Sequence, residues 1–308
     1  MTDLREAGPY EDRGDQPIGR VIVACWVLGF LLGCQSPSDR GDQVESVLVP
    51  SFDGVALAFE ERGEGDVTVV LIHGWCCNRR FWNGSIEALA ERYRVVALDL
   101  GGHGESGANR EAWSIPVLAR DVEAVVEHVV PEGQIVLVGH SMGGPVALGA
   151  VPLLDGRVVG VVAIDTLHDV EMVPPPEMIS TLVESYEGDF EGTMTEAVRS
   201  MFPADFEPAV VDRVIRQACT TDHRAAVALL ESYSTLDLPG LLKRAGVPVH
   251  CINAQPPRAP ETRLESNRQY GSLSVELMEG TGHYPMIEVP ERFIPRLLAV
   301  LASLSGEK

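Results

Sequence analysis

The sequence predicts an α/β domain built on a mostly parallel sheet of eight strands that is flanked by helices. Short, continuous apolar segments, which are typical of buried parallel strands, alternate with segments of helical periodicity. A serine enclosed by glycines, in Gly139-His140-Ser141-Met142-Gly143, stands where one such strand meets a helix. The alternation stops between residues 170 and 233, where the pattern is helical only. These observations predict one α/β core with a helical lid inserted after its sixth strand.

The expected elements follow one another in a regular order. Two stretches of alternating polarity predict an antiparallel hairpin ahead of the first fully apolar strand. The expected strands are 45–50, 55–61, 67–72, 95–98, 134–138, 158–164, 247–253 and 272–278. Helices are expected near 81–93, 115–129, 145–150, 237–244, 262–270 and 290–303. The core therefore comprises residues 44–169 and 234–308, and the lid comprises residues 170–233.

Composition excludes several classes of partner. The chain has 308 residues, of which 45% are hydrophobic, so it can bury a substantial core. Its formal net charge of -21 opposes binding to phosphate backbones, and no basic cluster reverses that balance, so nucleic acid is not an expected partner. No histidine shows metal-ligand spacing such as H-E-x-x-H, and neither a metal nor an organic cofactor is expected.

The N-terminus carries a candidate export signal. The uncharged run Val21–Gly33 is too short to span a bilayer as a helix, but it has the length of a signal-peptide core. It ends in Leu31-Leu32-Gly33-Cys34, which resembles the lipobox of bacterial lipoproteins. That resemblance implies a cleaved signal peptide (1–33), a lipidated Cys34, a flexible spacer (34–43), and an exported protein anchored to a bacterial membrane. A plain signal peptide or a membrane-associated helix stays open, because five acids in residues 1–20 depart from the usual basic leader.

The enclosed serine is a candidate nucleophile. In a G-x-S-x-G elbow the turn is so tight that a Cβ at either glycine, here Gly139 or Gly143, would collide across it. The helix that follows directs backbone N–H groups at the reacting carbonyl, where they stabilise a developing oxyanion. An ordinary glycine-rich turn between a strand and a helix has the same spelling, so the rest of the chain must decide between the two readings.

Four motifs in order, covering residues 44–308, resemble the α/β-hydrolase fold family. They are His73-Gly74-Trp75, Asp99-Leu-Gly-Gly-His-Gly-Glu-Ser-Gly107, the elbow and Gly280-Thr281-Gly282-His283. The resemblance implies Ser141 as nucleophile, His283 as general base, and the backbone N–H groups of Trp75 and Met142 as the oxyanion hole. It also implies that the His73 side chain positions its loop and that the 99–107 motif is structural.

The acid of the expected triad departs from the family pattern. Most members place an aspartate after the strand that follows the lid, but here that segment reads Asn253-Ala254-Gln255-Pro256-Pro257-Arg258 and holds no carboxylate. Some members take the acid from the end of the strand after the elbow helix, which here is followed by Asp165. Asp165 is therefore the predicted acid and Asp169, four residues on, is the alternative. The alternative interpretation is that Asp165 has only a structural role and orders the first segment of the lid.

These motifs predict a serine hydrolase that cleaves a carboxylic ester of a small, apolar acyl substrate through an acyl-enzyme. A carbon–carbon bond hydrolase and a cofactor-free haloperoxidase are alternatives on the same machinery, and a non-catalytic ligand-binding lipoprotein is the alternative from another class. Methionines 172, 178, 194 and 201 predict either an apolar roof over the substrate or the lid's own small core. Cysteines 76, 77, 219 and 251 are expected to be mostly free, buried thiols.

Overall fold

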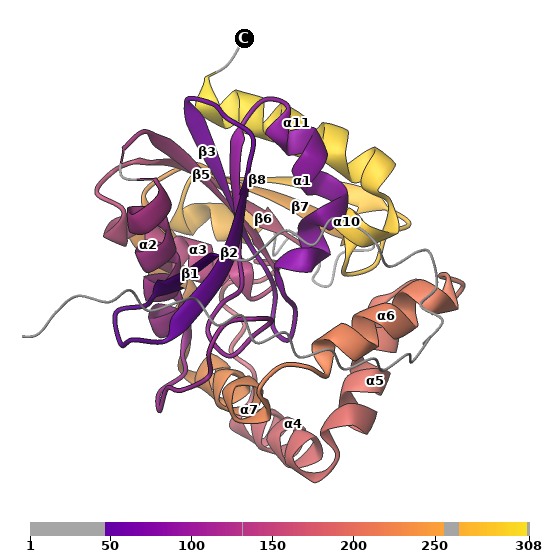
Figure 1. Cartoon of the computed structure of the whole chain (residues 1–308). Coiled ribbons are helices and arrows are strands. Elements are labelled where there is room, and N and C mark those ends of the chain that lie inside the picture. The colour runs from indigo at the N-terminus through magenta and orange to yellow at the C-terminus, as the bar shows by residue number, and fades with distance from the viewer. Residues whose placement is uncertain (1–46, 131, 256–264, 307–308) are drawn as a thin grey trace, which may run out of the picture. The chain divides into compact units, whose positions relative to one another are not determined.

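One eight-stranded sheet lies at the centre of the described chain (Figure 1). The computed structural model describes residues 47–130, 132–255 and 265–306, so the predicted signal peptide, Cys34 and the spacer lie outside the described residues. The strands are β1 (Val47–Pro50), β2 (Ala56–Arg62), β3 (Val67–Ile72), β4 (Arg94–Leu98), β5 (Gln134–His140), β6 (Val158–Ile164), β7 (Val249–Gln255) and β8 (Leu273–Glu279). The predicted number of strands is confirmed, as is the mostly parallel sheet.

Strand order decides which strand ends are neighbours. The order is β1-β2-β4-β3-β5-β6-β7-β8; β2 pairs antiparallel with β1 and with β4, and the other pairs are parallel. Ile72 on β3 is in register with Gly139 on β5, and His140 is in register with Ile164 on β6. The loops after β3, β5 and β6 therefore leave the same edge of the sheet side by side, which is where sites form in parallel α/β sheets.

Ten helices are described. They are α1 (Asn83–Ala90), α2 (Ile115–Val129), α3 (Gly143–Ala150), α4 (Pro176–Gly188), α5 (Phe190–Met201), α6 (Pro208–Ala218), α7 (His223–Ser232), α8 (Leu238–Ala245), α10 (Pro285–Glu288) and α11 (Pro290–Ser305). Short 3₁₀ helices occupy Arg79–Trp82, Val151–Leu153, Tyr233–Thr235 and Asn267–Tyr270. The last of these lies in the region where the sequence predicted a helix over 262–270. No helix among the described residues is long and apolar enough to span a bilayer.

Helices cover both faces of the sheet (Figure 1). On β3, Val70 and Ile72 belong to the apolar cluster that also holds residues of α2, α3 and α8, whereas Val69 and Leu71 belong to the cluster that includes α1 and α11. This alternation follows from the period of two along a strand and explains why β3 is apolar at every position except Thr68. Helix α2 begins where the Ser114 hydroxyl accepts a hydrogen bond from the Val117 N–H (3.4 Å).

Between β6 and β7, the four helices α4 to α7 lie in residues 170–233, which are called the insertion below, and α8 follows them. Met194 on α5 is buried, but Met172 and Met178 are 64% and 53% exposed. The predicted apolar roof therefore does not include these last two methionines. Cys76, Cys77 and Cys251 are buried free thiols and Cys219 is a half-buried one, which confirms the expectation for these cysteines.

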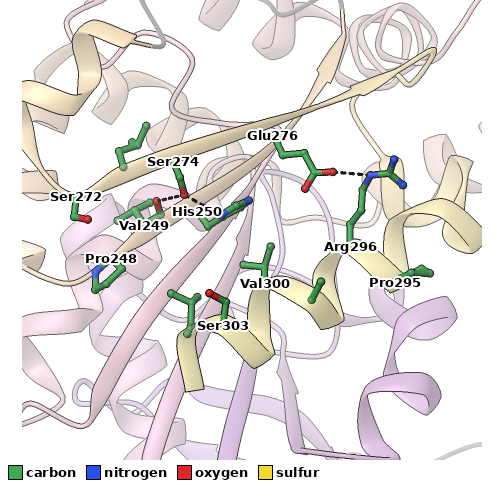
Figure 2. A pocket seen from close by; sticks show the side chains of 13 residues that line it. Pro248, Val249, His250, Ser272, Ser274, Glu276, Pro295, Arg296, Val300 and Ser303 are labelled. Carbon is green, nitrogen blue, oxygen red and sulfur yellow. Dashed lines mark hydrogen bonds and ion pairs between the residues drawn. The ribbon is translucent and has the colours of Figure 1, made fainter. Parts of the chain in front are cut away.

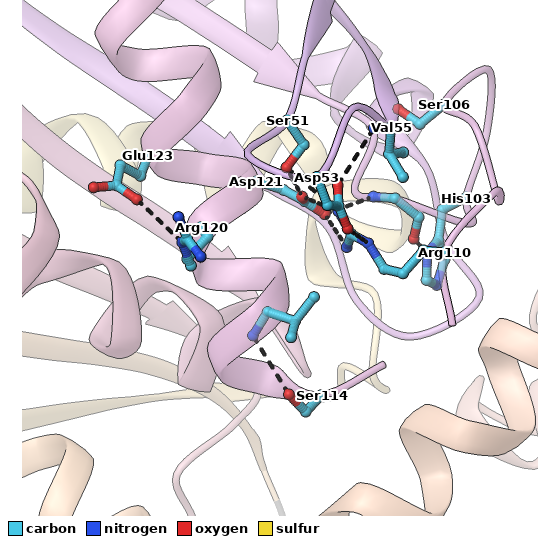
Figure 3. A network of polar contacts seen from close by, with 12 residues as sticks. Ser51, Asp53, Val55, His103, Ser106, Arg110, Ser114, Arg120, Asp121 and Glu123 are labelled. Carbon is cyan, nitrogen blue, oxygen red and sulfur yellow. Dashed lines mark hydrogen bonds and ion pairs between the residues drawn. The ribbon is translucent and has the colours of Figure 1, made fainter. Parts of the chain in front are cut away.

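A buried ionic network holds the β1–β2 turn and the loop after β4 against α2 (Figure 3). The Arg110 guanidinium lies 2.6 Å from Asp121 Oδ1 and 2.7 Å from Asp53 Oδ2. The Ser51 hydroxyl donates to Asp121 Oδ1 (2.6 Å), and the Gly101 N–H donates to Asp121 Oδ2 (3.1 Å). The Arg110 and Asp121 side chains are 2% and 0% exposed, so each compensates the desolvation of the other.

Candidate functional site

Ser141 stands in a sharp turn between β5 and α3. Its φ of +51° lies in the left-handed region, which residues with a side chain adopt only when their surroundings enforce it. The Ser141 N–H donates to the Ile164 carbonyl (2.9 Å), and the Ser141 carbonyl accepts from the Gly144 N–H (2.9 Å). A Cβ on Gly139 would collide with the backbone of Gly143. The turn is therefore as tight as the motif predicted, and Ser141 is only half-buried at the edge of the sheet.

Asp165 and His283 meet beside the elbow. His283 follows β8, and its Nδ1–H donates to Asp165 Oδ2 over 2.6 Å. The other oxygen, Oδ1, accepts from the Ala254 backbone N–H over 3.0 Å. The Asp165 side chain is 0% exposed and that of His283 is 8% exposed. Of the two candidate acids, Asp165 is thus the one in contact with the predicted base, whereas Asp169 accepts a hydrogen bond from the Glu171 N–H in its own loop.

The surroundings of Asp165 favour its charged form. Burial alone would raise the pKa of this carboxyl, but hydrogen bonds and charge interactions with His168 and His283 hold the pKa well below its ordinary value. The acid is consequently a carboxylate in the resting molecule. A carboxylate on Nδ1 fixes the imidazole tautomer that leaves Nε2 free to accept a proton.

The loop after β3, which carries the Trp75 N–H, approaches the elbow, which carries the Met142 N–H. A Cβ on Gly74 would lie 3.1 Å from the Ser141 Cβ and 2.9 Å from His140 Nδ1, so only glycine allows this approach. Within the described ranges, neither the Trp75 N–H nor the Met142 N–H donates to a protein acceptor. Both predicted oxyanion-hole donors therefore lie close to Ser141 and keep their hydrogen-bonding capacity.

His73 holds this loop from behind. Its Nδ1–H donates to the Gly74 carbonyl (2.8 Å), and its Nε2 accepts from the Leu100 N–H (3.0 Å). Burial lowers the pKa of His73 to about 4, so the ring is neutral and the tautomer is set by these two bonds. The expected positioning role of His73 agrees with these contacts, which link the loop after β3 to the 99–107 motif.

The insertion contacts both predicted catalytic loops. The His283 backbone N–H donates to the carbonyl of Met201 at the end of α5 (2.8 Å). The Trp75 indole N–H donates to the carbonyl of Ala226 on α7 (2.9 Å), and its ring packs edge-on against Tyr186 of α4. The insertion is therefore hydrogen-bonded to the loop of the predicted base and to the loop of the predicted oxyanion hole.

Sequence reasoning missed two histidines that surround the base. His140 Nε2 donates to the His283 carbonyl (2.8 Å), and the two rings lie 4.6 Å apart between centroids. His168 Nε2 lies 3.3 Å from Asp165 Oδ1. The available signal was position: one histidine adjoins the candidate nucleophile, and the other stands three residues after the candidate acid.

A surface groove lies elsewhere on the sheet. It has a volume of about 630 Å³ and runs between α11 and the beginnings of β7 and β8, where His250, Ser274, Glu276 and Arg296 line it (Figure 2). Ser141, Asp165 and His283 are not among its lining residues. In the part of the chain that the structure describes, no group of three or more His, Cys, Asp or Glu side chains is placed to hold a metal ion.

Two curated proteins align with most of the chain. The pimeloyl-[acyl-carrier protein] methyl ester esterase of Yersinia enterocolitica is 29% identical over 245 residues, which cover 75% of this chain and 92% of that protein. The karrikin insensitive 2 receptor CA of Petunia hybrida is 28% identical over 250 residues, which cover 77% and 92%. A shorter match, 32% identical over 121 residues, covers 32% of the dihydrolipoyllysine-residue acetyltransferase component of an acetoin cleaving system from Cupriavidus necator.

A solved structure has the same fold. The thermophilic esterase of Thermogutta terrifontis superposes with a TM-score of 0.75 and 24% identity, covering 85% of this chain and 99% of that one. The model of the alpha/beta hydrolase family matches residues 69–296, which include the elbow, both loops of the predicted oxyanion hole, Asp165 and His283. The predicted fold and enzyme class are confirmed: the chain belongs to the alpha/beta hydrolase family.

Proposed function

We propose that the protein is a serine esterase that cleaves a carboxylic ester of a small acyl substrate through a Ser141–His283–Asp165 triad. The observation that carries the proposal is the Asp165–His283 hydrogen bond of 2.6 Å beside a serine in a left-handed elbow. Ester cleavage by the esterases to which the chain is similar supports the choice of reaction. A serine at the elbow, in place of aspartate, favours acyl transfer.

Each residue has one role in the proposed reaction. The Ser141 hydroxyl attacks the acyl carbonyl carbon while His283 Nε2 accepts its proton, and Asp165 stabilises the resulting imidazolium through Nδ1–H. The Trp75 and Met142 N–H groups bind the oxyanion of the tetrahedral intermediate. His283 then returns the proton to the departing alkoxide, which leaves an acyl-serine. A water molecule, deprotonated by the same imidazole, releases the acid and restores Ser141.

The insertion acts as a lid over this reaction. Its buried aromatic and sulfur side chains, among them Phe190, Met194 and Phe202, favour a substrate with an apolar acyl group. A series of p-nitrophenyl esters of increasing acyl length measures that preference through kcat/KM. An optimum at acetyl with a steady decline toward longer chains would exclude a long apolar acyl pocket.

Labelling with a fluorophosphonate tests the nucleophile. The wild type is expected to be labelled at Ser141 and to hydrolyse p-nitrophenyl esters, and Ser141→Ala is expected to lose both while its circular dichroism stays unchanged. Undiminished turnover by Ser141→Ala would exclude the serine mechanism.

A non-catalytic ligand-binding protein is the second candidate, and the similarity to a plant receptor favours keeping it. The same labelling experiment separates the two functions. A folded wild type that neither reacts with the fluorophosphonate nor hydrolyses any ester of the series would favour binding over catalysis.

We further propose that Cys34 is the lipidated first residue of the mature, exported protein, so that the enzyme acts at a bacterial membrane. The sequence Leu31-Leu32-Gly33-Cys34 at the end of an apolar run supports this proposal. Mass spectrometry of the membrane fraction should find a diacylated Cys34, and Cys34→Ser should remove both the lipid and the membrane association. An unmodified N-terminus at another residue would contradict it.

A further inference from the structure

The carboxylate of Asp165 has an imidazole on each side. Oδ2 accepts from His283 Nδ1 over 2.6 Å, and Oδ1 lies 3.3 Å from Nε2 of His168. The His168 side chain is 12% exposed, and its Nε2 has no well-aligned hydrogen-bond partner among the described residues, so the charge of Asp165 is its electrostatic partner. The triad as usually drawn contains one imidazole for one carboxylate, and His168 is an addition to it.

The loop that carries both residues is built to hold this arrangement. Asp165 and Leu167 have φ values of +45° and +56°, and two such strained residues persist only when their surroundings fix them. The buried amide of Asn253 bonds both the N–H (3.2 Å) and the carbonyl (3.1 Å) of Thr166. That amide nitrogen also lies 3.4 Å from His168 Nδ1, where it donates to the ring and leaves the ring proton on Nε2, facing Asp165.

A second buried asparagine fixes the end of the loop. Asn267 Nδ2 donates to the carbonyls of Leu167 (2.7 Å) and His168 (3.3 Å), and Asn267 Oδ1 accepts from the Val170 N–H (3.1 Å). Asn253 lies within β7, near the carboxyl end of that strand. Its amide therefore orients a histidine toward the acid that follows β6.

We propose that His168 is a positioning residue that shares the Asp165 carboxylate with His283 and holds that carboxylate in place. With His168 present, His283 stays unprotonated down to a lower pH than it would without this second imidazole. This inference rests on the proposed function, because it assigns the general base to His283. It extends that function by giving the enzyme a wider range of activity on the acidic side.

The charge balance around the pair explains the direction of the effect. Among the described residues, a further titratable group that acts on this pair is His140 on β5, whose pKa burial lowers well below its ordinary value, so that its ring is neutral. Glu171 lies further along, where it accepts from the Tyr270 hydroxyl. A proton on either imidazole would partly neutralise the shared carboxylate and so disfavour a proton on the other.

Sharing moves the loss of activity to lower pH whichever imidazole is the more basic. Molecules that carry the proton on His168 still hold a neutral His283 and stay active, whereas without His168 the same carboxylate stabilises a proton on His283 alone. Removing the second imidazole must therefore raise the pH at which His283 is protonated. A residue that only packed against Asp165 would change the rate without moving that pH.

Two substitutions of His168 separate its role in holding Asp165 from its ability to take up a proton. His168→Gln keeps an amide donor near the place of Nε2 but cannot take up a proton, and His168→Phe keeps the ring volume but loses the donor. For His168→Gln, the acidic midpoint of kcat/KM against pH should rise by about 0.5–1 pH unit, with kcat at pH 8–9 within about threefold of the wild type. For His168→Phe, kcat at that pH should also fall about tenfold at unchanged KM, because Oδ1 of Asp165 then keeps the Ala254 N–H but loses the imidazole beside it.

The ring resonances of His283, followed by NMR between pH 4 and 9, report its protonation without any turnover. They should shift to higher pH in His168→Gln by the same amount as the activity. His250→Gln, which replaces a half-buried histidine in the groove of Figure 2, is the matched control and should move neither curve.

The outcomes separate this inference from the proposed function. Equal NMR midpoints in the wild type and His168→Gln would overturn the inference, even if the enzyme is an active esterase. A raised NMR midpoint in a protein that hydrolyses no ester would sustain the shared carboxylate and overturn the proposed function.

Discussion

Asp121 and Asp165 both have side chains that are 0% exposed, yet the partners of these two aspartates differ in kind. Asp121 faces the guanidinium of Arg110, a permanent cation, together with the Ser51 hydroxyl. Asp165 faces the imidazoles of His283 and His168, which are cations only when protonated. The charge of Asp121 is thus neutralised at every pH of interest, whereas that of Asp165 is neutralised only when an imidazole gains a proton.

Under the proposed function, this difference separates a structural carboxylate, Asp121, from a reactive one, Asp165. A carboxylate that is already paired with a permanent cation does not stabilise charge that develops elsewhere in a transition state. The Asp121–Arg110 pair therefore acts only on stability, by holding loops together. A carboxylate beside a neutral imidazole stabilises the imidazolium of the transition state more than it stabilises the neutral ring of the ground state. Stronger stabilisation of the transition state than of the ground state is the condition for catalysis.

Replacing Asp165 should have the largest effect of these substitutions, and the quantity that it changes should be kcat. Asp165→Asn keeps the shape of the side chain but removes the charge that stabilises the His283 imidazolium, so kcat should fall by up to ~10⁴. Steady-state kinetics on a p-nitrophenyl ester give kcat, with circular dichroism as the control for folding. A drop of less than tenfold would mean that another group supports His283.

Replacing Asp121 should cost stability and spare the rate. Asp121→Asn removes the fully buried one of the two carboxylates that pair with Arg110 and leaves only Asp53, so the free energy of unfolding should fall by up to about 3–5 kcal/mol. Urea denaturation measures this loss, and kcat per folded molecule should stay within about threefold of the wild type. The double variant Asp121→Asn/Arg110→Met is the matched control and should recover part of the stability. A large loss of kcat at unchanged stability would reverse the assignment.

Among the histidines, His73 provides the contrast to His283, because it bonds to backbone groups in place of a carboxylate. Its pKa is about 4 in the folded protein, against an ordinary value of 6.5. Between these two pH values the ring is protonated in the unfolded chain but neutral in the native protein. Stability from this group is complete above pH 6.5 and is lost as pH falls toward 4, by about 3 kcal/mol in all. Urea denaturation between pH 4.5 and 8 should show this slope, and His73→Gln should flatten it. Equal slopes would mean that His73 is protonated in the native state.

The smallest effect is expected at Asp169, the other acid on the loop after β6. Asp169→Asn should lower kcat tenfold or less, about 1.4 kcal/mol at most, because its Oδ1 accepts from a backbone N–H of its own loop. The same kinetic assay as for Asp165→Asn makes the two variants directly comparable. A larger loss at Asp169 than at Asp165 would exchange their roles.

Much of the fold could be predicted from the sequence, because the signals are local. The apolar runs of 67–72 and 158–164 coincide with β3 and β6, and the interruption of the alternation marks α4 to α7. The glycines of the elbow were informative because they are required by close approaches within the same turn. His283 could be placed because its motif lies between the last strand and the closing helix.

The remaining features depend on contacts that periodicity does not encode. Asp165 and Asp169 follow the same strand, and only the left-handed backbone at residues 165 and 167 decides which carboxylate turns toward His283. Arg110 reaches Asp53 across 57 positions of the chain, and no motif marks that pair. His168 lies beside the acid because Asn253, 85 positions away, orients its ring.

The hydrogen bond from the His283 N–H to the Met201 carbonyl bears on how such enzymes are engineered and diversify. Substrate range is commonly altered by exchanging the helices above the active site, on the assumption that the catalytic residues belong to the scaffold alone. Here α5 supplies an acceptor to the loop of the base and α7 supplies one to Trp75, so a grafted insertion would bring its own alignment of the base and the oxyanion hole. Under the proposed function, exchanging the insertion would therefore change selectivity and rate together, and a chimera must preserve the two hydrogen bonds to the catalytic loops.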